Sequence, residues 1–466
     1  MQLVTELKPH QVIGVEKLRQ IKIGALYMSM GTGKTLTALQ LIAMRLNAGK
    51  VDHVLWLCPC SVKPTIAAEF KKHIAEGIKL IRIEGIESLS SSIRLNCELL
   101  ELVQNNRVFL VVDESNLVKN HRAQRTTNIE RLASYCQYKL ILNGTPISKS
   151  EKDLFAQWYI LDWRILGYKS FWSFAANHLE YDKEIKGKIN RVLNVDYLVK
   201  KIAPYTYQVK KEECLNLPEK HYYTEYAGFT YEQRCEYESV KDEFLMQVDE
   251  LEPTTIYRLF TALQHVISGN RIISSYKQRI RTTPMFDDPL DNPRIQALLD
   301  LVKRLEGEKV IIWCKYTSEI KNISQVLREE YGDTVCEFYG EVNQRNRKKE
   351  AERFAGDALY FVANKTCAGY GLNLQFCNNV IYYTNDWDYA TRAQSEDRVH
   401  RMGQDKSVYI YDICNSLTLD ERILNCLQRK GNLVDELKCK IKRQMSTTKL
   451  RQWLDGEEIG NDTDRI

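Results

Sequence analysis

The sequence contains no apolar run long enough to cross a membrane, and its N-terminus lacks the basic and then apolar pattern of a secretory signal. Its 13 cysteines are scattered and include no Cys-x-x-Cys pair, the nearest two being Cys58 and Cys60. An odd number of dispersed cysteines argues against a disulfide framework or a structural zinc site, and favours reduced thiols. We therefore expect a cytoplasmic protein that has no membrane partner.

No charge of one sign dominates, because 66 Lys and Arg against 61 Asp and Glu leave a net charge of +5. Such a balance permits nucleic acid as a partner without requiring it, since a basic groove can be hidden under a near-neutral average. Hydrophobic residues make up 44% of the chain, as in folded globular proteins. A chain of 466 residues exceeds one ordinary core, so about two to four domains are expected.

A glycine-rich segment with the sequence Met-Ser-Met-Gly-Thr-Gly-Lys-Thr occupies residues 28–35, between an apolar run at 25–27 and a segment of helical apolar spacing. In the order strand, loop, helix, the loop N–H groups and the helix N-terminus surround a phosphate. Lys34 then reaches the outer phosphates and the Thr35 hydroxyl holds Mg²⁺. An ordinary glycine turn before a helix would show the same residues, so the remaining sequence has to decide.

Continuous apolar runs separated by helical patterns predict two α/β domains. Such runs fit strands that are buried on both faces of a parallel sheet. In the first half they lie at 54–57, 108–112 and 140–142, and in the second half at 310–314, 359–362, 380–383 and 408–411. The second half has no glycine loop of its own.

The predicted organisation has four parts. We expect a first lobe at 1–150 that extends to about residue 215, mostly helical insertions and a linker at 151–289, a second lobe at 290–419, and a helical tail at 420–466. The tail carries a basic cluster formed by Lys438, Lys440, Lys442 and Arg443.

Two carboxylates, Asp113 and Glu114, directly follow the apolar run at 108–112. The carboxyl end of a central strand is where α/β sheets bind ligands. Asp113 can hold Mg²⁺ through water, and Glu114 can orient and deprotonate an attacking water, which are parts that phosphoryl transfer needs. A solvated acidic turn is the alternative. The turn at 143–146 follows the next strand and could couple this edge to motion, or be a turn only.

Two arginines stand three residues apart at Arg398 and Arg401, a spacing that predicts one face of a helix. On a domain without its own phosphate loop they could act as arginine fingers on γ-phosphate oxygens. The alternative is a surface helix paired with Glu396 and Asp397. Two glycines, Gly369 and Gly371, follow a strand and fit either close approach to a phosphodiester or a tight turn.

Taken together, these segments resemble the motifs of the superfamily-two (DEAD/DEAH-box-like) helicases and, within them, the Swi/Snf-type DNA translocases. The motifs come in the family order from residue 7 to about residue 412. They lie at 7–11, 29–35 (motif I), 57–59 (Ia), 113–116 (II), 142–146 (III), 310–314 (IV), 368–374 (V) and 394–404 (VI).

The resemblance implies the following site residues. ATP would be bound by Gln11, which would read the adenine edge, and by Met30, Gly31, Thr32, Gly33, Lys34, Thr35 and Gly371. Catalysis would use Lys34, Asp113, Glu114, Gln394, Arg398 and Arg401, with Mg²⁺ held by Thr35 and Asp113. Nucleic acid would be contacted by Pro59, Thr366, Gly369, Asn373 and Trp387.

Some positions depart from the family pattern. Asn116 replaces the usual histidine of motif II, which puts in doubt how that loop signals to the second lobe. Asn143 replaces a threonine or serine of motif III, and residues 385–389 depart from the usual Trp-Asn-Pro around Trp387. Met28 stands where the longer P-loop signature has a glycine, a position at which the family does not require one.

The resemblance implies two RecA-like lobes with helical insertions and a helical tail. It further implies an ATP-dependent translocase that holds double-stranded or branched DNA through its phosphates, and that can also have protein partners. The compact form is typical of bacteria or phages, although a nuclear location stays open. Alternatives are a helicase that separates forks or RNA strands, and the motor subunit of a restriction or defence complex. An ATP-gated scaffold or loader is a further alternative, against which the intact Lys34, Glu114, Arg398 and Arg401 argue.

Overall fold

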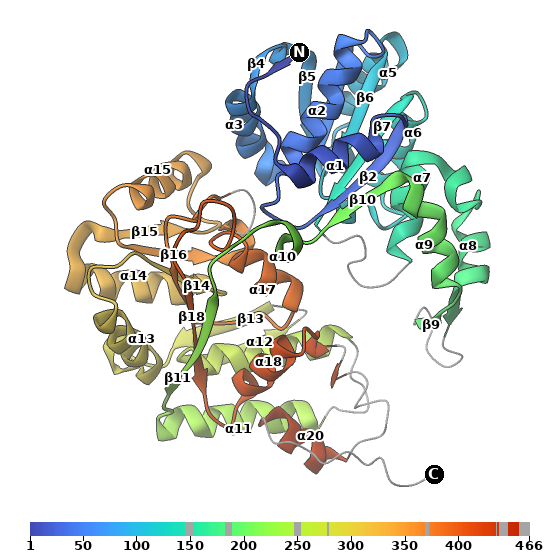
Figure 1. Ribbon diagram of the computed structural model, residues 1–466. Coiled ribbons are helices and arrows are strands. Elements are labelled where there is room, and N and C mark those ends of the chain that lie inside the picture. Colours follow the sequence, from blue (N-terminus) through green and yellow to red (C-terminus); the bar gives the residue numbers. More distant parts are fainter. Residues whose placement is uncertain are drawn as a thin grey trace. The chain divides into compact units, whose positions relative to one another are not determined.

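The computed structural model describes residues 1–144, 152–181, 189–246, 253–276, 279–368, 372–434, 436–437 and 446–455 (Figure 1). It divides into two compact units, Met1–Asn216 and Leu217–Ile466. Several predicted features lie outside the described residues. They are Thr145 and Pro146 of motif III, Gly369 and Gly371 of motif V, the side chain of Thr366, and the basic cluster of the tail.

A six-stranded sheet forms the centre of the described part of the first unit, and every pairing in it is parallel. Its order is β10 (Thr206–Val209), β2 (Ile23–Met28), β7 (Tyr138–Asn143), β6 (Val108–Val112), β3 (His53–Cys58) and β5 (Ile81–Gly85). Strands far apart in sequence are therefore neighbours, and their carboxyl ends meet at one edge of the sheet.

Helices cover both faces of this sheet. One face carries α1 (Pro9–Leu18), α2 (Lys34–Asn47) and α3 (Lys63–His73), and the other α5 (Ile93–Asn105), α6 (Gln124–Ala133), α7 (Asp153–Leu166), α8 (Phe171–His178) and α9 (Val195–Ile202). Along β2, Ala25 and Tyr27 belong to one core while Leu26 and Met28 belong to the other. This alternation into two apolar cores is why the strand has no polar face.

Smaller elements complete the first unit. They are the antiparallel pairs of β1 (Gln2–Leu3) with β4 (Ile74–Glu76) and of β8 (Leu179–Tyr181) with β9 (Ile189–Val192), and the short helices α4 (Ser88–Ser91) and α10 (Lys211–Cys214).

The second unit repeats the parallel arrangement with another sheet of six described strands. Its order is β11 (Lys220–Ala227), β18 (Val408–Asn415), β17 (Asn379–Tyr382), β14 (Val310–Cys314), β16 (Tyr360–Asn364) and β15 (Val335–Phe338). Helices α13 (Pro293–Arg304) and α14 (Thr317–Tyr331) pack into the core of one face, and α15 (Gln344–Ala355) into that of the other. The short helices α16 (Lys365–Ala368) and α17 (Tyr389–Glu396) follow β16 and β17.

A separate helical core adjoins this sheet within the second unit. It joins α11 (Tyr231–Leu245), α12 (Pro253–Ile267), α18 (Leu419–Gln428) and α20 (Thr447–Leu454), and the hairpin of β12 (Asn270–Tyr276) and β13 (Arg279–Pro284) lies next to α12. The C-terminal helix is packed here, because Trp453 is buried and the fully buried Lys241 on α11 forms an ion pair of 2.6 Å with Asp455.

These two parallel sheets with helices on both faces are RecA-like lobes, so the predicted fold class is confirmed. Residues 151–289, which were expected to be mostly helical, also supply β10 to the first sheet and β11 to the second. Each cysteine in the described part of the chain is a free thiol, as predicted.

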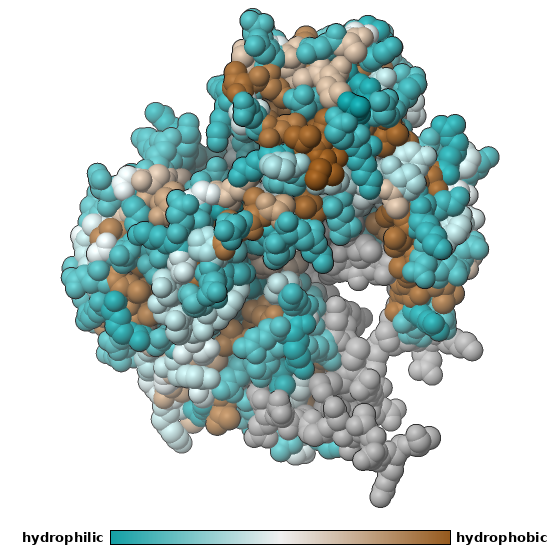
Figure 2. All heavy atoms as spheres, in the orientation of Figure 1, coloured by the Kyte–Doolittle hydropathy of each residue, from teal (hydrophilic) through white to brown (hydrophobic). Residues whose placement is uncertain are grey.

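The surface is mainly polar on the face drawn in Figure 2, with a brown area over α1. On that helix the side chains of Val12 and Ile13 are 44% and 60% exposed. Among the described residues, no helix combines the length and the apolar character that a membrane span requires.

A buried arginine ties the sheet of the second unit to its helices. Arg294, at the start of α13, is 1% exposed and forms an ion pair of 2.6 Å with Asp420 on α18. Its Nε donates to the carbonyl of Tyr383, just after β17, at 3.1 Å. Its Nη2 donates to the carbonyl of Ile413, within β18, at 2.9 Å. Asp420 is equally inaccessible, so each charge depends on the other.

We predict that Arg294→Ala lowers the free energy of unfolding of the second unit by about 3–5 kcal/mol, because it leaves the Asp420 charge buried without a partner. Arg304→Ala, on the same helix, removes an exposed ion pair with Glu225 and should cost about 0–1 kcal/mol. Urea denaturation followed by circular dichroism compares the two variants. Equal costs would contradict a structural role for the buried pair.

Candidate nucleotide and nucleic-acid site

The glycine loop turns sharply between β2 and α2. Gly31 and Gly33 have φ values of 78° and 85°, a left-handed conformation that glycine adopts without steric cost. The loop is closed by its own side chains, since the Thr32 hydroxyl donates to the Ser29 carbonyl at 2.7 Å. Lys34 Nζ donates to the Met28 carbonyl at 3.0 Å, which holds its ammonium group over the loop.

The end of strand β7 lies beside this loop. Asn143 pairs with Tyr27 in the sheet register, and Gly144 follows it. A Cβ atom placed on Gly144 would lie 3.8 Å from Lys34 Nζ. The segment that resembles motif III therefore begins next to the lysine of motif I, although the two are far apart in sequence.

The carboxylates predicted to serve catalysis lie at the end of β6. Asp113 is 8% exposed, and its Oδ1 accepts a hydrogen bond of 3.0 Å from the backbone N–H of Glu114. Burial, and to a lesser extent the neighbouring Glu114 charge, raise the pKa of Asp113 to about 7 although the Lys34 ammonium opposes the rise. Glu114 has a φ of 49°, a strained conformation for a residue other than glycine, of the kind that clusters at functional sites.

These residues are suited to bind a nucleoside triphosphate together with a divalent cation. A cation next to Asp113 would stabilise the charge that burial disfavours. Thr35 lies in the first turn of α2, where backbone N–H groups have no partner within the helix. Within the described ranges no group of three His, Cys, Asp or Glu side chains could hold a metal, so a cation here would also need oxygen atoms of water or ligand.

Helix α1 contacts the glycine loop through two adjacent side chains. Gln11, predicted to read adenine, is 1% exposed, and its Nε2 donates to the carbonyls of Thr32 at 3.1 Å and Gly33 at 3.4 Å. His10 Nε2 bonds to the same Thr32 carbonyl at 2.8 Å. Sequence reasoning gave His10 no role, although it stands within the motif at 7–11.

The arginines of motif VI are not on a helix, and the predicted helical face is wrong. Helix α17 ends at Glu396, and Arg398 and Arg401 lie in the turn that follows. The reason is a tertiary contact, because the Arg398 carbonyl accepts a hydrogen bond of 3.1 Å from the backbone N–H of Leu374. Arg401 Nη1 in turn donates to Asn373 Oδ1 at 2.6 Å. Motifs V and VI thus meet at Asn373 and Arg401, while Gln394 lies on α17, partly exposed.

A buried arginine, Arg392, anchors α17 and was not predicted. Its guanidinium forms hydrogen bonds with both carboxylate oxygens of Asp412, one of them at 3.0 Å, and with Glu396 at 2.8 Å. It also lies 3.5 Å from the ring centroid of Tyr382. The four-residue spacing of Arg392 and Glu396 on a helix was the sequence signal that could have identified it.

The residues proposed to contact nucleic acid differ in their surroundings. Asn373 is exposed, Pro59 is buried, and Thr366 lies on α16. The Trp387 ring is partly buried against Phe260, with centroids 5.6 Å apart, and Lys315 Nζ lies 3.0 Å from its centroid. Burial lowers the pKa of Lys315 to about 8 even though the Asp386 carboxylate, 3.1 Å away, opposes the change. One face of Trp387 is therefore covered by protein.

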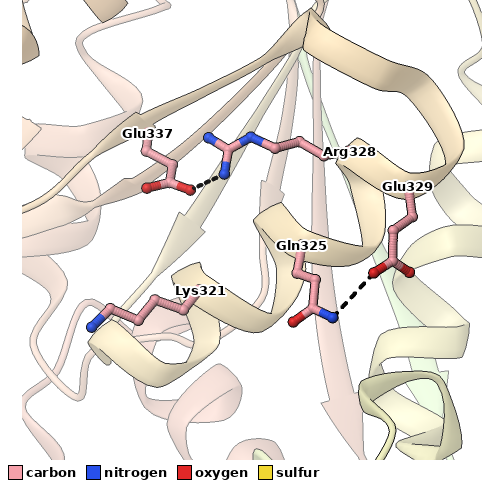
Figure 3. A pocket seen from close by; sticks show the side chains of 5 residues that line it. All are labelled: Lys321, Gln325, Arg328, Glu329 and Glu337. Atoms are coloured by element: carbon pink, nitrogen blue, oxygen red, sulfur yellow. Dashed lines mark hydrogen bonds and ion pairs between the residues drawn. The ribbon is translucent and has the colours of Figure 1, made fainter.

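A shallow depression on α14 and β15 has a different character (Figure 3). It is lined by Lys321, Gln325, Arg328, Glu329 and Glu337. Arg328 forms an ion pair of 2.7 Å with Glu337, and Gln325 donates to Glu329 at 3.1 Å. Lys321 forms an ion pair of 2.9 Å with Glu341, just outside the depression, and we assign the depression no function.

Two family models match the chain. The SNF2-related domain matches residues 79–275, and the helicase conserved C-terminal domain matches residues 293–403. The first match begins downstream of the glycine loop and contains Asp113 and Glu114. The second contains Arg398 and Arg401.

Two similar proteins have names that describe them as ATP-dependent helicases. The chain is 25% identical over 462 residues to an uncharacterised ATP-dependent helicase of Mycoplasma genitalium, covering 92% of this chain and 42% of that protein. It is 23% identical over 467 residues to the uncharacterised ATP-dependent helicase YqhH of Bacillus subtilis, covering 92% and 79%. The chain thus spans about two fifths of the Mycoplasma protein.

A solved structure, the Sulfolobus solfataricus SWI2/SNF2 ATPase core in complex with dsDNA, matches with a TM-score of 0.41 and 22% identity, over 98% of this chain and 100% of that one. The family assignment stands on the two matched models in the order that the motifs predict. The chain therefore belongs to the Swi/Snf-type superfamily-two helicases.

Proposed function

We propose that the chain is an ATP-driven translocase that moves along duplex or branched DNA. The observation that carries this proposal is the gathering of Lys34, Asp113 and Glu114 at the carboxyl edge of one sheet. An ATP-using motor needs these three functions together, namely a phosphate-holding ammonium, a metal-holding carboxylate and a second carboxylate for water.

In the proposed mechanism the glycine loop and Lys34 hold the triphosphate, and Thr35 and Asp113 hold Mg²⁺. A Mg²⁺ ion held there would supply positive charge to neutralise the phosphate oxygens. Glu114 orients the attacking water and accepts its proton.

Arg398 and Arg401 complete the proposed site. Each offers a planar, permanently charged guanidinium that can stabilise the charge that develops on the γ-phosphate. Arg392 holds the end of α17, and the Leu374–Arg398 hydrogen bond holds the turn that carries both arginines. Turnover then depends on groups from both lobes, which would couple hydrolysis to their movement along a strand.

Membership of the Swi/Snf-type family supports DNA as the track. Grip through phosphates, including contacts from Pro59, Thr366, Gly369, Asn373 and Trp387, would give little sequence specificity and strong salt dependence. Of these residues Asn373 is exposed and accessible to such a contact, whereas Pro59 is buried.

We predict that Glu114→Gln lowers kcat for ATP hydrolysis by about 10²–10⁴-fold, because the amide cannot accept the proton of the attacking water. ATP binding should change little, since the amide keeps the size of the carboxylate. Steady-state hydrolysis and equilibrium binding of a fluorescent ATP analogue measure the two effects. Glu76→Gln, at an exposed position on β4, is the matched control. Undiminished turnover in Glu114→Gln would remove Glu114 from the base role.

We predict that Arg401→Ala lowers kcat by about 10³-fold or more, because the charge on the transferring phosphoryl group loses its guanidinium partner. The affinity for ATP should stay within a few-fold of the wild type. Lys406→Ala removes an exposed cation five residues on and should leave kcat unchanged. A loss of ATP affinity with unchanged kcat would instead make Arg401 a binding residue.

The choice of nucleic acid is tested by adding duplex DNA, forked DNA, single-stranded DNA and RNA to the ATPase assay. We expect duplex or branched DNA to stimulate hydrolysis most, with stimulation falling steeply as salt rises because phosphate contacts release counterions. Stronger stimulation by RNA or single strands would favour a strand-separating helicase. A rate of ATP hydrolysis that none of these nucleic acids changes would favour an ATP-gated scaffold and overturn the proposal.

A further inference from the structure

The peptide unit between Thr32 and Gly33 is held through its carbonyl group by two side chains of α1. Its carbonyl, that of Thr32, accepts hydrogen bonds from His10 Nε2 at 2.8 Å and from Gln11 Nε2 at 3.1 Å. In a planar trans peptide the C=O and N–H groups point in opposite directions. The Gly33 N–H must therefore point away from α1 as long as His10 and Gln11 hold the carbonyl.

This restraint matters because glycine stands on both sides of Thr32. The φ values of 78° at Gly31 and 85° at Gly33 place both glycines where they rotate at little steric cost. The Thr32–Gly33 peptide turns about ψ of Thr32 and φ of Gly33, so the freedom of Gly33 lets it flip and turn its carbonyl oxygen towards an incoming phosphate. The glycines alone do not fix the loop in a phosphate-binding conformation, and an outside contact has to do so.

His10 is itself held by a residue from the other end of the first unit. Tyr207, on strand β10, donates its hydroxyl to the His10 carbonyl at 2.5 Å and is 7% exposed. Its ring packs so closely on Gly14 that a Cβ atom there would lie 2.7 Å from Tyr207 Cδ1. The same strand contacts the loop directly, because the Val209 carbonyl accepts the Ser29 N–H at 3.1 Å.

We propose that His10 and Tyr207 are positioning residues that keep the Thr32–Gly33 peptide from flipping, so that the Gly33 N–H stays available to a phosphate. Tyr207 sets the position of α1, and His10 and Gln11 transmit that position to the Thr32 carbonyl. The inference rests on the proposed nucleotide site and deepens it, because it assigns α1 to the triphosphate end of the ligand. If α1 contacted the base instead, its variants would weaken the binding of ATP but not that of a triphosphate without a base.

The test compares ATP with inorganic tripolyphosphate, a probe that has no base. In His10→Leu and Tyr207→Phe, we expect the KM for ATP to rise about threefold to tenfold, the factor that one lost hydrogen bond produces. The inhibition constant of tripolyphosphate should rise by the same factor. The kcat at saturating ATP should stay within about twofold, since ATP binding pushes the peptide back into place.

Three further variants separate positioning from general damage. His10→Gln keeps an N–H donor and should restore most of the affinity. Gly14→Ala should reproduce the effect by displacing the Tyr207 ring, without any change to Tyr207 or His10. Val12→Ala, at an exposed position of the same helix, should leave both constants unchanged. Thermal denaturation confirms that each variant is folded before the constants are compared.

A rise in the KM for ATP with an unchanged tripolyphosphate constant would overturn the proposal, because the residues would then act on the base. Unchanged constants for both ligands would overturn it as well. A wild-type protein that neither hydrolyses ATP nor binds tripolyphosphate would refute the nucleotide site itself, which is a separate failure.

Discussion

The burial of the Asp113 carboxylate beside Lys34 is the constraint on which the first lobe depends. A buried carboxylate destabilises a fold unless an opposite charge or several hydrogen bonds accompany it. Asp113 is 8% exposed, and its pKa is raised although Lys34 lies near enough to oppose the rise. The parallel order β2, β7, β6 brings these two charges to one edge. The fold therefore holds a carboxylate whose charged form is disfavoured at the place where a cation would bind.

The second lobe uses buried charge differently, because two of its buried arginines, Arg294 and Arg392, are paired with carboxylates. Arg392 engages Asp412 and Glu396, and Arg294 engages Asp420, all at the carboxyl ends of strands or on the helices that follow them. Apolar side chains of similar size would often stabilise such positions as well. What a paired arginine adds is direction, since its planar fork fixes the angle at which a helix meets the sheet.

Strands buried on both faces could be predicted from the sequence, and half-exposed strands could not. The apolar runs at 108–112 and 310–314 coincide with β6 and β14, because a strand between two apolar cores has no polar residue to interrupt the run. The edge strand β11 contains Tyr222, Tyr223 and Tyr226 exposed to solvent, and no apolar run marks it. The end of α17 was also missed, because the Leu374–Arg398 contact that shapes the turn is not local in sequence.

The same distinction separates the parts of the site that were predicted from those that were not. Lys34, Thr35, Asp113 and Glu114 stand in short motifs, where spacing along the chain is enough to suggest chemistry. The contacts that orient such motifs cross the chain: Tyr207 and His10 are 197 residues apart. No local pattern links the two. Positioning residues have to be identified from the structure of each chain, and their effects tested one chain at a time.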